Sequence, residues 1–286
     1  MLLAVPNFSE GRDEAKVGAI SAAFATGAAV LDSHSDPVHN RSVLTMEAPA
    51  GSLAGALVAG ARTCVEAIDM TAHEGAHPCI GALDVCPVVW LREADRDPAR
   101  HEALEAARTI AAESGVPVFL YGELASDQRH AERSYFRQGG LLELRRRMTS
   151  GELAPDFGPA EPHPTAGATL VTARPPLVAF NITLEGADRD IGREVAAGLR
   201  EAGGGPPGVR AIAIDLGEGT IQISTNVHNP VAVPLGEIVE QVRALAGRRG
   251  ARPSAAELIG LAPEAALAGY PEDVPLQGFD PARHVI

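Results

Sequence analysis

The chain has 286 residues, of which 45% are hydrophobic and 21% are charged, so it can bury a large core and is too apolar for a disordered protein. Its formal net charge of −13 repels nucleic acid and anionic lipid over the surface as a whole. We therefore expect small-molecule partners, with no nucleic acid and no membrane among them. Any anionic substrate must meet a local group of arginines.

The cysteines and the N-terminus predict the compartment. Three cysteines in a chain of this length do not suggest a disulfide framework and indicate a reducing environment. The N-terminal stretch MLLAVPNFSEGR has no basic region, and its apolar run ends at Pro6, so it is not typical of a signal peptide. Since no stretch approaches the ~20 apolar residues of a membrane helix, we predict a cytoplasmic protein.

The first part of the chain alternates predicted strands and helices. Apolar residues recur at three- and four-residue spacing over 52–70, and typical start and stop residues bound a helix over 97–115. The strands expected around them are 2–7, 29–34, 41–47, 86–91 and 116–121. From residue 2 to 91 the order is therefore strand, helix, strand, strand, helix, strand. That order is a split βαβ, or ferredoxin-like, unit.

The same order recurs between residues 177 and 261. Ile191, Val195 and Leu199 form one helical stripe, and a second helix is entered through Pro234. The strands expected around these helices are 177–184, 209–216, 220–227 and 255–261. The predicted fold class is α/β, in the α+β sense: two ferredoxin-like lobes, each a mostly antiparallel sheet with its helices on one face.

A segment rich in glycine and proline, residues 151–176, joins the two lobes. A segment this long and irregular inside a compact protein is more typical of a binding loop than of a tether. We place the domain boundary after residue 173, which gives domains 1–173 and 174–286. Because pockets favour such boundaries, we expect the ligand cleft between the two lobes.

The segment HEGAHPCIGALDVCP, residues 73–87, contains the HExxH pattern of zinc proteases. Such a site needs a helix, which places its two histidines on one face. Gly75 inside the pattern and Pro78 directly after His77 oppose a helix here. We therefore predict no metal site and expect His73 to be a solvated loop residue.

His77 lies in a turn whose backbone Pro78 and Gly81 restrict. An imidazole titrates near neutral pH, so a histidine held in a fixed turn is suited to general acid and base catalysis. The sequence favours His77 as a catalytic residue.

Seven segments together resemble the formiminotransferase domain of glutamate formimidoyltransferase. They follow one another along nearly the whole chain: VPNFSEG (5–11), HNRSV (39–43), HEGAHPCIGALDVCP (73–87), VPVFLYGE (116–123), PDFGP (155–159), HPTAGAT (163–169) and LVAFNITL (177–184). The resemblance implies an N-terminal and a C-terminal formiminotransferase subdomain, commonly in a homodimer, with folate held between the lobes. It implies a one-carbon transferase that moves the formimidoyl group from N-formimidoyl-L-glutamate to N5 of tetrahydrofolate during histidine degradation.

The resemblance also implies site residues. The family's catalytic histidine corresponds to His77, and tetrahydrofolate is a co-substrate. The folate-binding loop corresponds to Gly158, Pro159, Ala160, Glu161, Pro162, His163, Pro164, Thr165, Ala166 and Gly167. Since planar bidentate pairing suits the substrate carboxylates, Arg41 is the first candidate to bind them and Arg174 the second. Weaker candidates for substrate contact are Asp36, Asn40 and Asp84; the two aspartates could also orient His77.

Three other functions stay open at this point. A formyl-folate transferase of the same family differs only in having O in place of NH on the transferred group. A zinc hydrolase would use the HEGAH segment. A non-catalytic module would use ferredoxin-like lobes to bind a ligand, as this fold often does.

Overall fold

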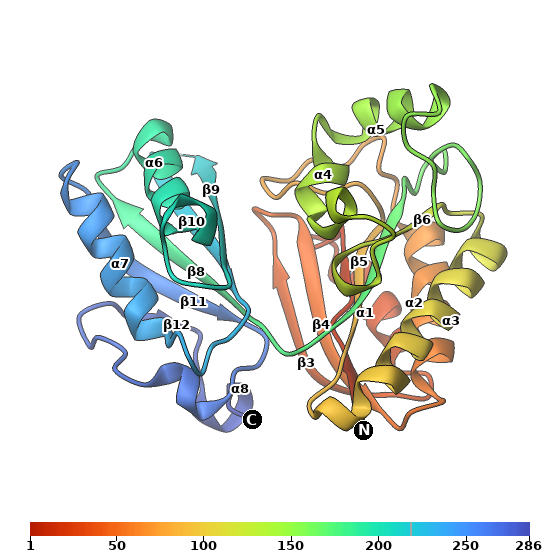
Figure 1. Cartoon of the computed structure of the whole chain (residues 1–286), viewed down its shortest axis with the longest axis horizontal. Coiled ribbons are helices and arrows are strands. Elements are labelled where there is room, and N and C mark those ends of the chain that lie inside the picture. The colour runs from red at the N-terminus through yellow and green to blue at the C-terminus, as the bar shows by residue number, and fades with distance from the viewer. Residues whose placement is uncertain (218) are drawn as a thin grey trace. The chain divides into compact units, whose positions relative to one another are not determined.

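The computed structural model describes residues 1–217 and 219–286. The chain forms two compact units, Met1–Pro175 and Pro176–Ile286 (Figure 1). Among the described residues, no helix combines the length and the apolar character needed to cross a membrane.

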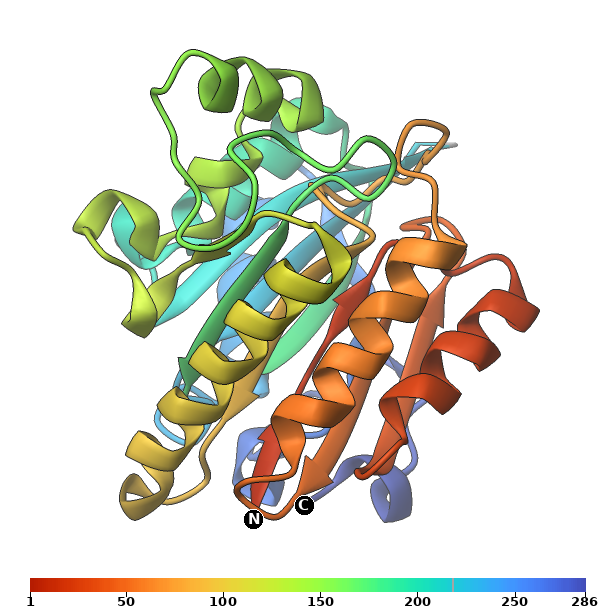
Figure 2. The same ribbon diagram turned by 90° about the vertical axis from the view of Figure 1, so that its right-hand side faces the viewer.

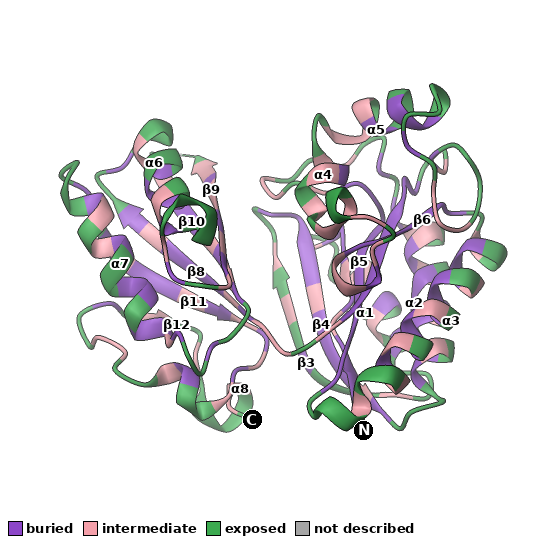
Figure 3. Ribbon diagram, viewed as in Figure 1, coloured by how far each residue is buried: buried purple, intermediate pink, exposed green. Residues whose placement is uncertain are grey.

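A seven-stranded sheet forms the centre of the first unit (Figure 1). Its strands are β1 (Leu2–Ala4), β2 (Asn7–Phe8), β3 (Ala29–Asp36), β4 (Arg41–Ala48), β5 (Leu83–Val89), β6 (Val118–Leu120) and β7 (Thr169–Arg174). β3 pairs with β4, and both β1 and β2 pair with β4 and with β5, all antiparallel. β7 pairs in parallel with β5 and with β6. The edge strand β3 is exposed along much of its length (Figure 3).

Three helices lie side by side on one face of this sheet (Figure 2): α1 (Glu14–Phe24), α2 (Leu53–Ala67) and α3 (Arg96–Ser114). Their apolar sides and the facing strand residues form one continuous core, with Phe8, Phe24 and Leu57 fully buried in it. Asp13 caps α1 by accepting two backbone N–H groups, and Gly115 ends α3 in the left-handed conformation. Cys64, predicted as a core residue, is buried in this core.

Two further helices depart from the prediction that helices cover only one face. α4 (Arg133–Arg137) and α5 (Gly140–Thr149) pack against the opposite side of the sheet at its β5, β7 and β6 end. Alternation along the strands shows the two sides, because Val118 belongs to the core under α3 whereas Phe119 belongs to a second core with Phe136. The first unit is thus covered on both faces at this end.

The strand β7 corrects the prediction that residues 151–176 are irregular throughout. Residues 169–174 form an almost fully buried strand that lies between β5 and β6. Its partners are distant in sequence, with Leu170 opposite both Val85 and Phe119. The glycine and proline content on either side of this short apolar run concealed it.

The second unit is a five-stranded sheet in the order β12-β11-β8-β10-β9. Its elements are β8 (Val178–Glu185), α6 (Arg189–Leu199), β9 (Val209–Gly217), β10 (Thr220–Val227), α7 (Leu235–Gly247), β11 (Arg252–Ile259), β12 (Leu276–Gln277) and α8 (Pro281–His284). The predicted order strand, helix, strand, strand, helix, strand is present from β8 to β11. These four strands pair antiparallel, and α6 and α7 contribute to a single core with them.

Candidate active site

Several predicted substrate-contacting residues lie on the face of the first sheet opposite α1, α2 and α3. On β4, Leu44 points into the core with those helices, and Arg41 therefore lies on the other face. On β7, Ala173 lies in that core, which places its neighbour Arg174 opposite. We call this side, which carries Arg41 and Arg174, the polar face.

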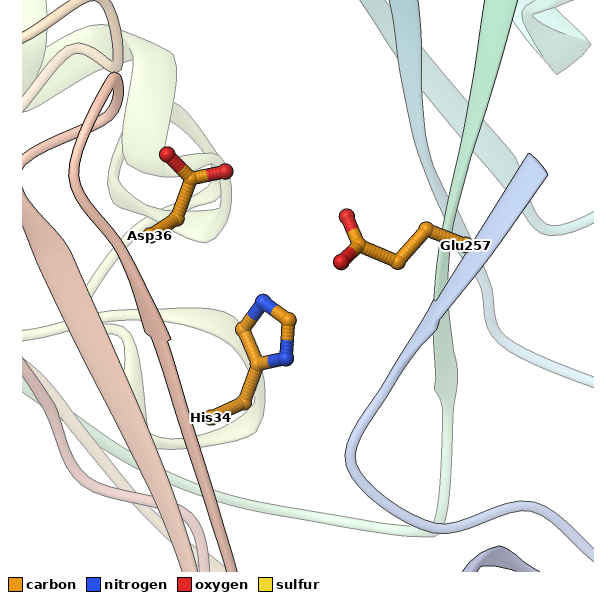
Figure 4. A group of neighbouring side chains, drawn as sticks. All are labelled: His34, Asp36 and Glu257. Carbon is orange, nitrogen blue, oxygen red and sulfur yellow. The ribbon is translucent and has the colours of Figure 1, made fainter. Parts of the chain in front are cut away.

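The polar face continues onto β3. Asp36 pairs with Arg41, and His34 stands two residues earlier on the same strand. Figure 4 shows the side chains of His34 and Asp36 directed to the same side of β3. The figure also draws Glu257, which belongs to β11 of the second unit.

Asp84 is the buried centre of this site, with no exposed surface. Its carboxylate accepts hydrogen bonds from Arg41 Nη1 at 2.7 Å, from the backbone N–H of Ile80 at 2.9 Å, and from Arg137 Nη2. Burial alone would raise the pKa of Asp84, but Arg137 and Arg41 outweigh it and hold the pKa below its ordinary value. Arg41 also donates to Asn7 Oδ1 at 2.8 Å, so both of its terminal nitrogens have partners inside the protein.

Asn40 fixes the turn that precedes Arg41. It is the one non-glycine residue with a positive φ, 48°, among the described residues. Its side chain accepts from the backbone N–H of Gly11 at 3.0 Å and donates to the carbonyl of Glu74 at 3.1 Å. Asn40 therefore holds the turn against the segment that leads to His77, which is a structural role in addition to the predicted substrate contact.

Asp36 and His39 connect this turn to His77. Asp36 Oδ1 accepts from the backbone N–H of Val38 at 2.7 Å and of His39 at 2.8 Å, while Oδ2 lies 3.7 Å from His39 Nε2. The His39 ring meets the His77 ring edge to face, with centroids 5.9 Å apart. His39 was not among the predicted site residues, although it stands in the HNRSV segment.

His77 is a half-buried imidazole in a non-helical turn. Its Nδ1 lies 2.8 Å from the carbonyl oxygen of Pro78, which can only accept, so Nδ1 carries the proton and donates. Nε2 then holds the lone pair and can act as a base. Burial lowers the pKa of His77 well below its ordinary value, and Arg41, Arg137, His39 and Arg133 lower it further. The ring is thus neutral at neutral pH.

The HExxH segment does not have the geometry of a zinc protease site. Residues 73–77 form bends and coil rather than a helix, as the glycine and proline predicted. His73 lies beside Asn40, whose Nδ2 is 3.3 Å from His73 Nδ1. The zinc hydrolase alternative is therefore not favoured.

The predicted folate loop, residues 158–167, has an exposed first half and an anchored second half. Gly158 to Glu161 are exposed, whereas Ala166 and Gly167 are buried. His163 and Gly167 exchange both backbone hydrogen bonds, at 2.8 and 3.1 Å. At Gly167, which has a φ of 70°, a Cβ would overlap the carbonyl oxygen of Ile80.

The anchored half of the loop pairs with the chain that directly follows His77. Ala82 donates its backbone N–H to the carbonyl of Ala166 at 2.9 Å, and Ala168 donates to Ile80 at 2.9 Å. Loop and histidine are therefore held on neighbouring backbone segments within the first unit.

Two arginines of α4, Arg133 and Arg137, were missed by the sequence analysis. They are four residues apart, so a helix directs them to the same side. Both act electrostatically on His77. Arg174, which was predicted, donates to the carbonyl of Pro175 at 3.0 Å, and burial lowers its pKa to about 10.

The chain belongs to the formiminotransferase family, because residues 1–174 match the family described as formiminotransferase domain, N-terminal subdomain. It is 36% identical to the glutamate formimidoyltransferase of Thermoplasma acidophilum over 96% of this chain and 93% of that protein. The corresponding protein of Streptococcus pyogenes serotype M1 is 35% identical over 99% and 96% of the two chains. The formimidoyltransferase-cyclodeaminase of Sus scrofa is 38% identical over 92% of this chain, and the aligned region covers 50% of that protein.

Proposed function

We propose that this protein is a glutamate formimidoyltransferase that moves the formimidoyl group from N-formimidoyl-L-glutamate to N5 of tetrahydrofolate. Two relatives bear that enzyme name and align with the chain over nearly the full length of both partners. The observation that carries the proposal is His77, a neutral imidazole whose Nδ1 is committed to Pro78 and whose Nε2 is left as a base.

The proposed chemistry requires proton transfers at two nitrogens. N5 of tetrahydrofolate attacks the amidine carbon, and a bond between N5 and that carbon forms. The tetrahedral intermediate loses the N5 proton, the glutamate nitrogen gains a proton, and the bond from carbon to that nitrogen breaks. One imidazole beside both nitrogens can accept the first proton and supply the second. Holding two substrates together provides much of the remaining acceleration.

The buried ion pairs support a positioning role for Asp84 and Arg41. Both terminal nitrogens of Arg41 have partners inside the protein, so the side chain is held in one position. Its positive charge also acts on His77. Asp36 orients His39, whose ring contacts that of His77. These contacts keep the catalytic ring in one place, as efficient proton transfer demands.

The remaining proposals concern folate and the wider role of the protein. We propose that residues 158–167 bind tetrahydrofolate, since the first half of the loop is exposed and its second half pairs with the segment that directly follows His77. Acid and base catalysis alone can drive the transfer, so we propose no metal cofactor. The cytoplasmic location, the homodimer, the role in histidine degradation and a folate cleft between the two lobes stay predictions.

The test is a transfer assay with purified protein, N-formimidoyl-L-glutamate and tetrahydrofolate, read by the absorbance of the folate product. We expect His77→Ala to lower turnover by about two to four powers of ten, while folate binding survives. His101→Ala is the control, because His101 is exposed on α3, and we expect it to keep turnover. N-formylglutamate as an alternative donor distinguishes the formyl-transferring reaction. Near-normal turnover of the His77→Ala variant would exclude His77 as the acid and base.

A further inference from the structure

The polar face holds more positive charge than its internal partners neutralise. Three guanidinium groups, those of Arg41, Arg133 and Arg137, act on the His77 imidazole. Among residues 1–217 and 219–286, Asp84 is the one carboxylate that hydrogen-bonds to any of the three. Arg41 and Arg137 share this one buried carboxylate, and Arg133 has no carboxylate partner among the described residues.

Arg133 is the clearest of these uncompensated groups. Its guanidinium lies over the ring of Tyr121, with Cζ 5.9 Å from the ring centroid. No carboxylate or other acceptor within the described chain receives a hydrogen bond from it. Arg133 is half-buried, and partial burial of a guanidinium without a charged partner is unfavourable, so burial lowers its pKa below the ordinary value. A planar anion would satisfy it.

Arg137 and Tyr121 add donors beside Arg133. Arg137 uses Nη2 on Asp84, but its Nε is buried and has no acceptor among the described residues. Tyr121 is buried on the same side of the sheet as Phe119, and burial raises the pKa of its hydroxyl, which therefore stays protonated and able to donate. Guanidinium and hydroxyl donors of this kind match the oxygens of a carboxylate.

Because these arginines act on His77, they indicate which substrate carboxylate binds to them. In the donor substrate, the α-carboxylate is attached to the carbon that bears the departing nitrogen. That nitrogen is the atom that His77 must protonate in the proposed reaction. A carboxylate near the imidazole is therefore the α-carboxylate of the donor, because the glutamate tail of the folate is separated from N5 by C6, the C9 methylene, N10 and the whole benzoyl group.

We propose that Arg133, together with Arg137 and Tyr121, binds the α-carboxylate of the glutamate-type donor and of the glutamate product. The inference rests on the proposed function for the identity of the ligand. It makes Arg133 a specificity-determining residue that also places the departing nitrogen beside His77.

The first test compares Arg133→Gln with the parent protein. Because a bidentate charged pair is lost, we expect KM for N-formimidoyl-L-glutamate to rise about 10- to 100-fold, with KM for tetrahydrofolate changed less than about twofold. Calorimetry should show the same loss of affinity for L-glutamate. The control is Arg129→Gln, which removes an exposed arginine four residues earlier and should change neither value. Donor KM and glutamate affinity both within about twofold of the parent would overturn the proposal.

A second measurement on the unaltered protein does not depend on how the variant folds. L-glutamate should bind. Relative to L-glutamate, the γ-amide L-glutamine, which keeps the α-carboxylate, should bind somewhat more weakly. The α-amide isoglutamine, which lacks the α-carboxylate, should bind much more weakly. Equal binding of the two amides would overturn the proposal. Glutamate binding that depends on Arg133 in a protein without transfer activity would support the site and refute the proposed function. Normal transfer activity in the parent, together with unchanged donor KM and glutamate affinity in Arg133→Gln, would refute the proposed site but not the proposed function.

Discussion

Replacing Asp84 by asparagine tests the buried ion pair beneath His77. Asparagine has nearly the same shape and can still accept from the backbone N–H of Ile80, but it removes the negative charge between Arg41 and Arg137. Since Asp84 has no exposed surface, water cannot replace that charge. Removing one partner of a buried ion pair typically costs about 3–5 kcal/mol. We expect a loss of this size from the free energy of unfolding of the first unit.

Thermal and urea unfolding measure this loss. For a unit of this size, 1 kcal/mol corresponds to about 2–4 °C, so the Tm of the first unit should fall by about 6–20 °C. Asp95→Asn is the control, because Asp95 pairs with the exposed Arg92 and should have a much smaller effect. A loss below about 1 kcal/mol in the Asp84 variant would refute the reasoning that this carboxylate is the main counter-ion of the two arginines.

The same ion pair predicts acid sensitivity with a definite sign. The folded-state pKa of Asp84 lies below its ordinary value, so the unfolded chain takes up this proton first as the pH falls. Its stabilising contribution is complete above about pH 4 and is lost as the pH falls through the folded pKa. The difference in stability between the parent and Asp84→Asn should therefore shrink in acid. A constant difference down to the folded pKa would contradict this assignment.

Two further substitutions test local geometry. Gly167→Ala should destabilise the first unit more than Gly27→Ala in urea unfolding, since both glycines have positive φ but only a Cβ at 167 would overlap the carbonyl of Ile80; equal losses would contradict the close approach. Glu102→Gln should lower the free energy of unfolding by about 1 kcal/mol, because this buried carboxylate accepts two backbone N–H groups at the start of α2. No change in the urea midpoint would show that the carboxylate's charge is unimportant there.

Elements determined by local pattern could be predicted from the sequence. The helix predicted over 97–115 is α3, Arg96–Ser114, because Pro98 near its start and Gly115 at its end are typical boundary residues, and Gly115 ends it in the left-handed conformation. Strands such as β10, Thr220–Val227, coincide with the prediction to the residue. Their boundaries are set by neighbouring residues, which the sequence displays directly.

Elements that depend on distant partners could not be predicted in the same way. β7 is a short apolar run between loops, and it becomes a strand because β5 and β6 pair with it on either side. α5 did carry a usable signal, since Leu141, Leu144 and Met148 stand at helical spacing. The preceding glycines obscured it.

The same distinction between local patterns and distant partners applies to the candidate site. The non-helical turn at His77 follows from its glycine and proline neighbours and was predicted. The role of Arg41 as a partner of Asp84 was not, because the two residues lie 43 positions apart in sequence. Arg133 and Arg137 reach the site from α4, whose packing against the polar face no local pattern reveals.

The charges around His77 lead to a last prediction, on the pH dependence of catalysis. Burial, and after it the charges of Arg41, Arg137, His39 and Arg133, disfavour the charged form of the imidazole, so the acid limb of kcat/KM should lie below pH 6.5, the ordinary value. A donor carboxylate bound at Arg133 offsets part of this charge and raises the pKa of His77 in the complex, which prepares the ring to protonate the departing nitrogen. Because kcat reports the complex, its acid limb should lie at higher pH than that of kcat/KM, and Arg133→Gln should reduce the separation. Coincident acid limbs in the parent enzyme would show that the donor does not change the charge felt by His77.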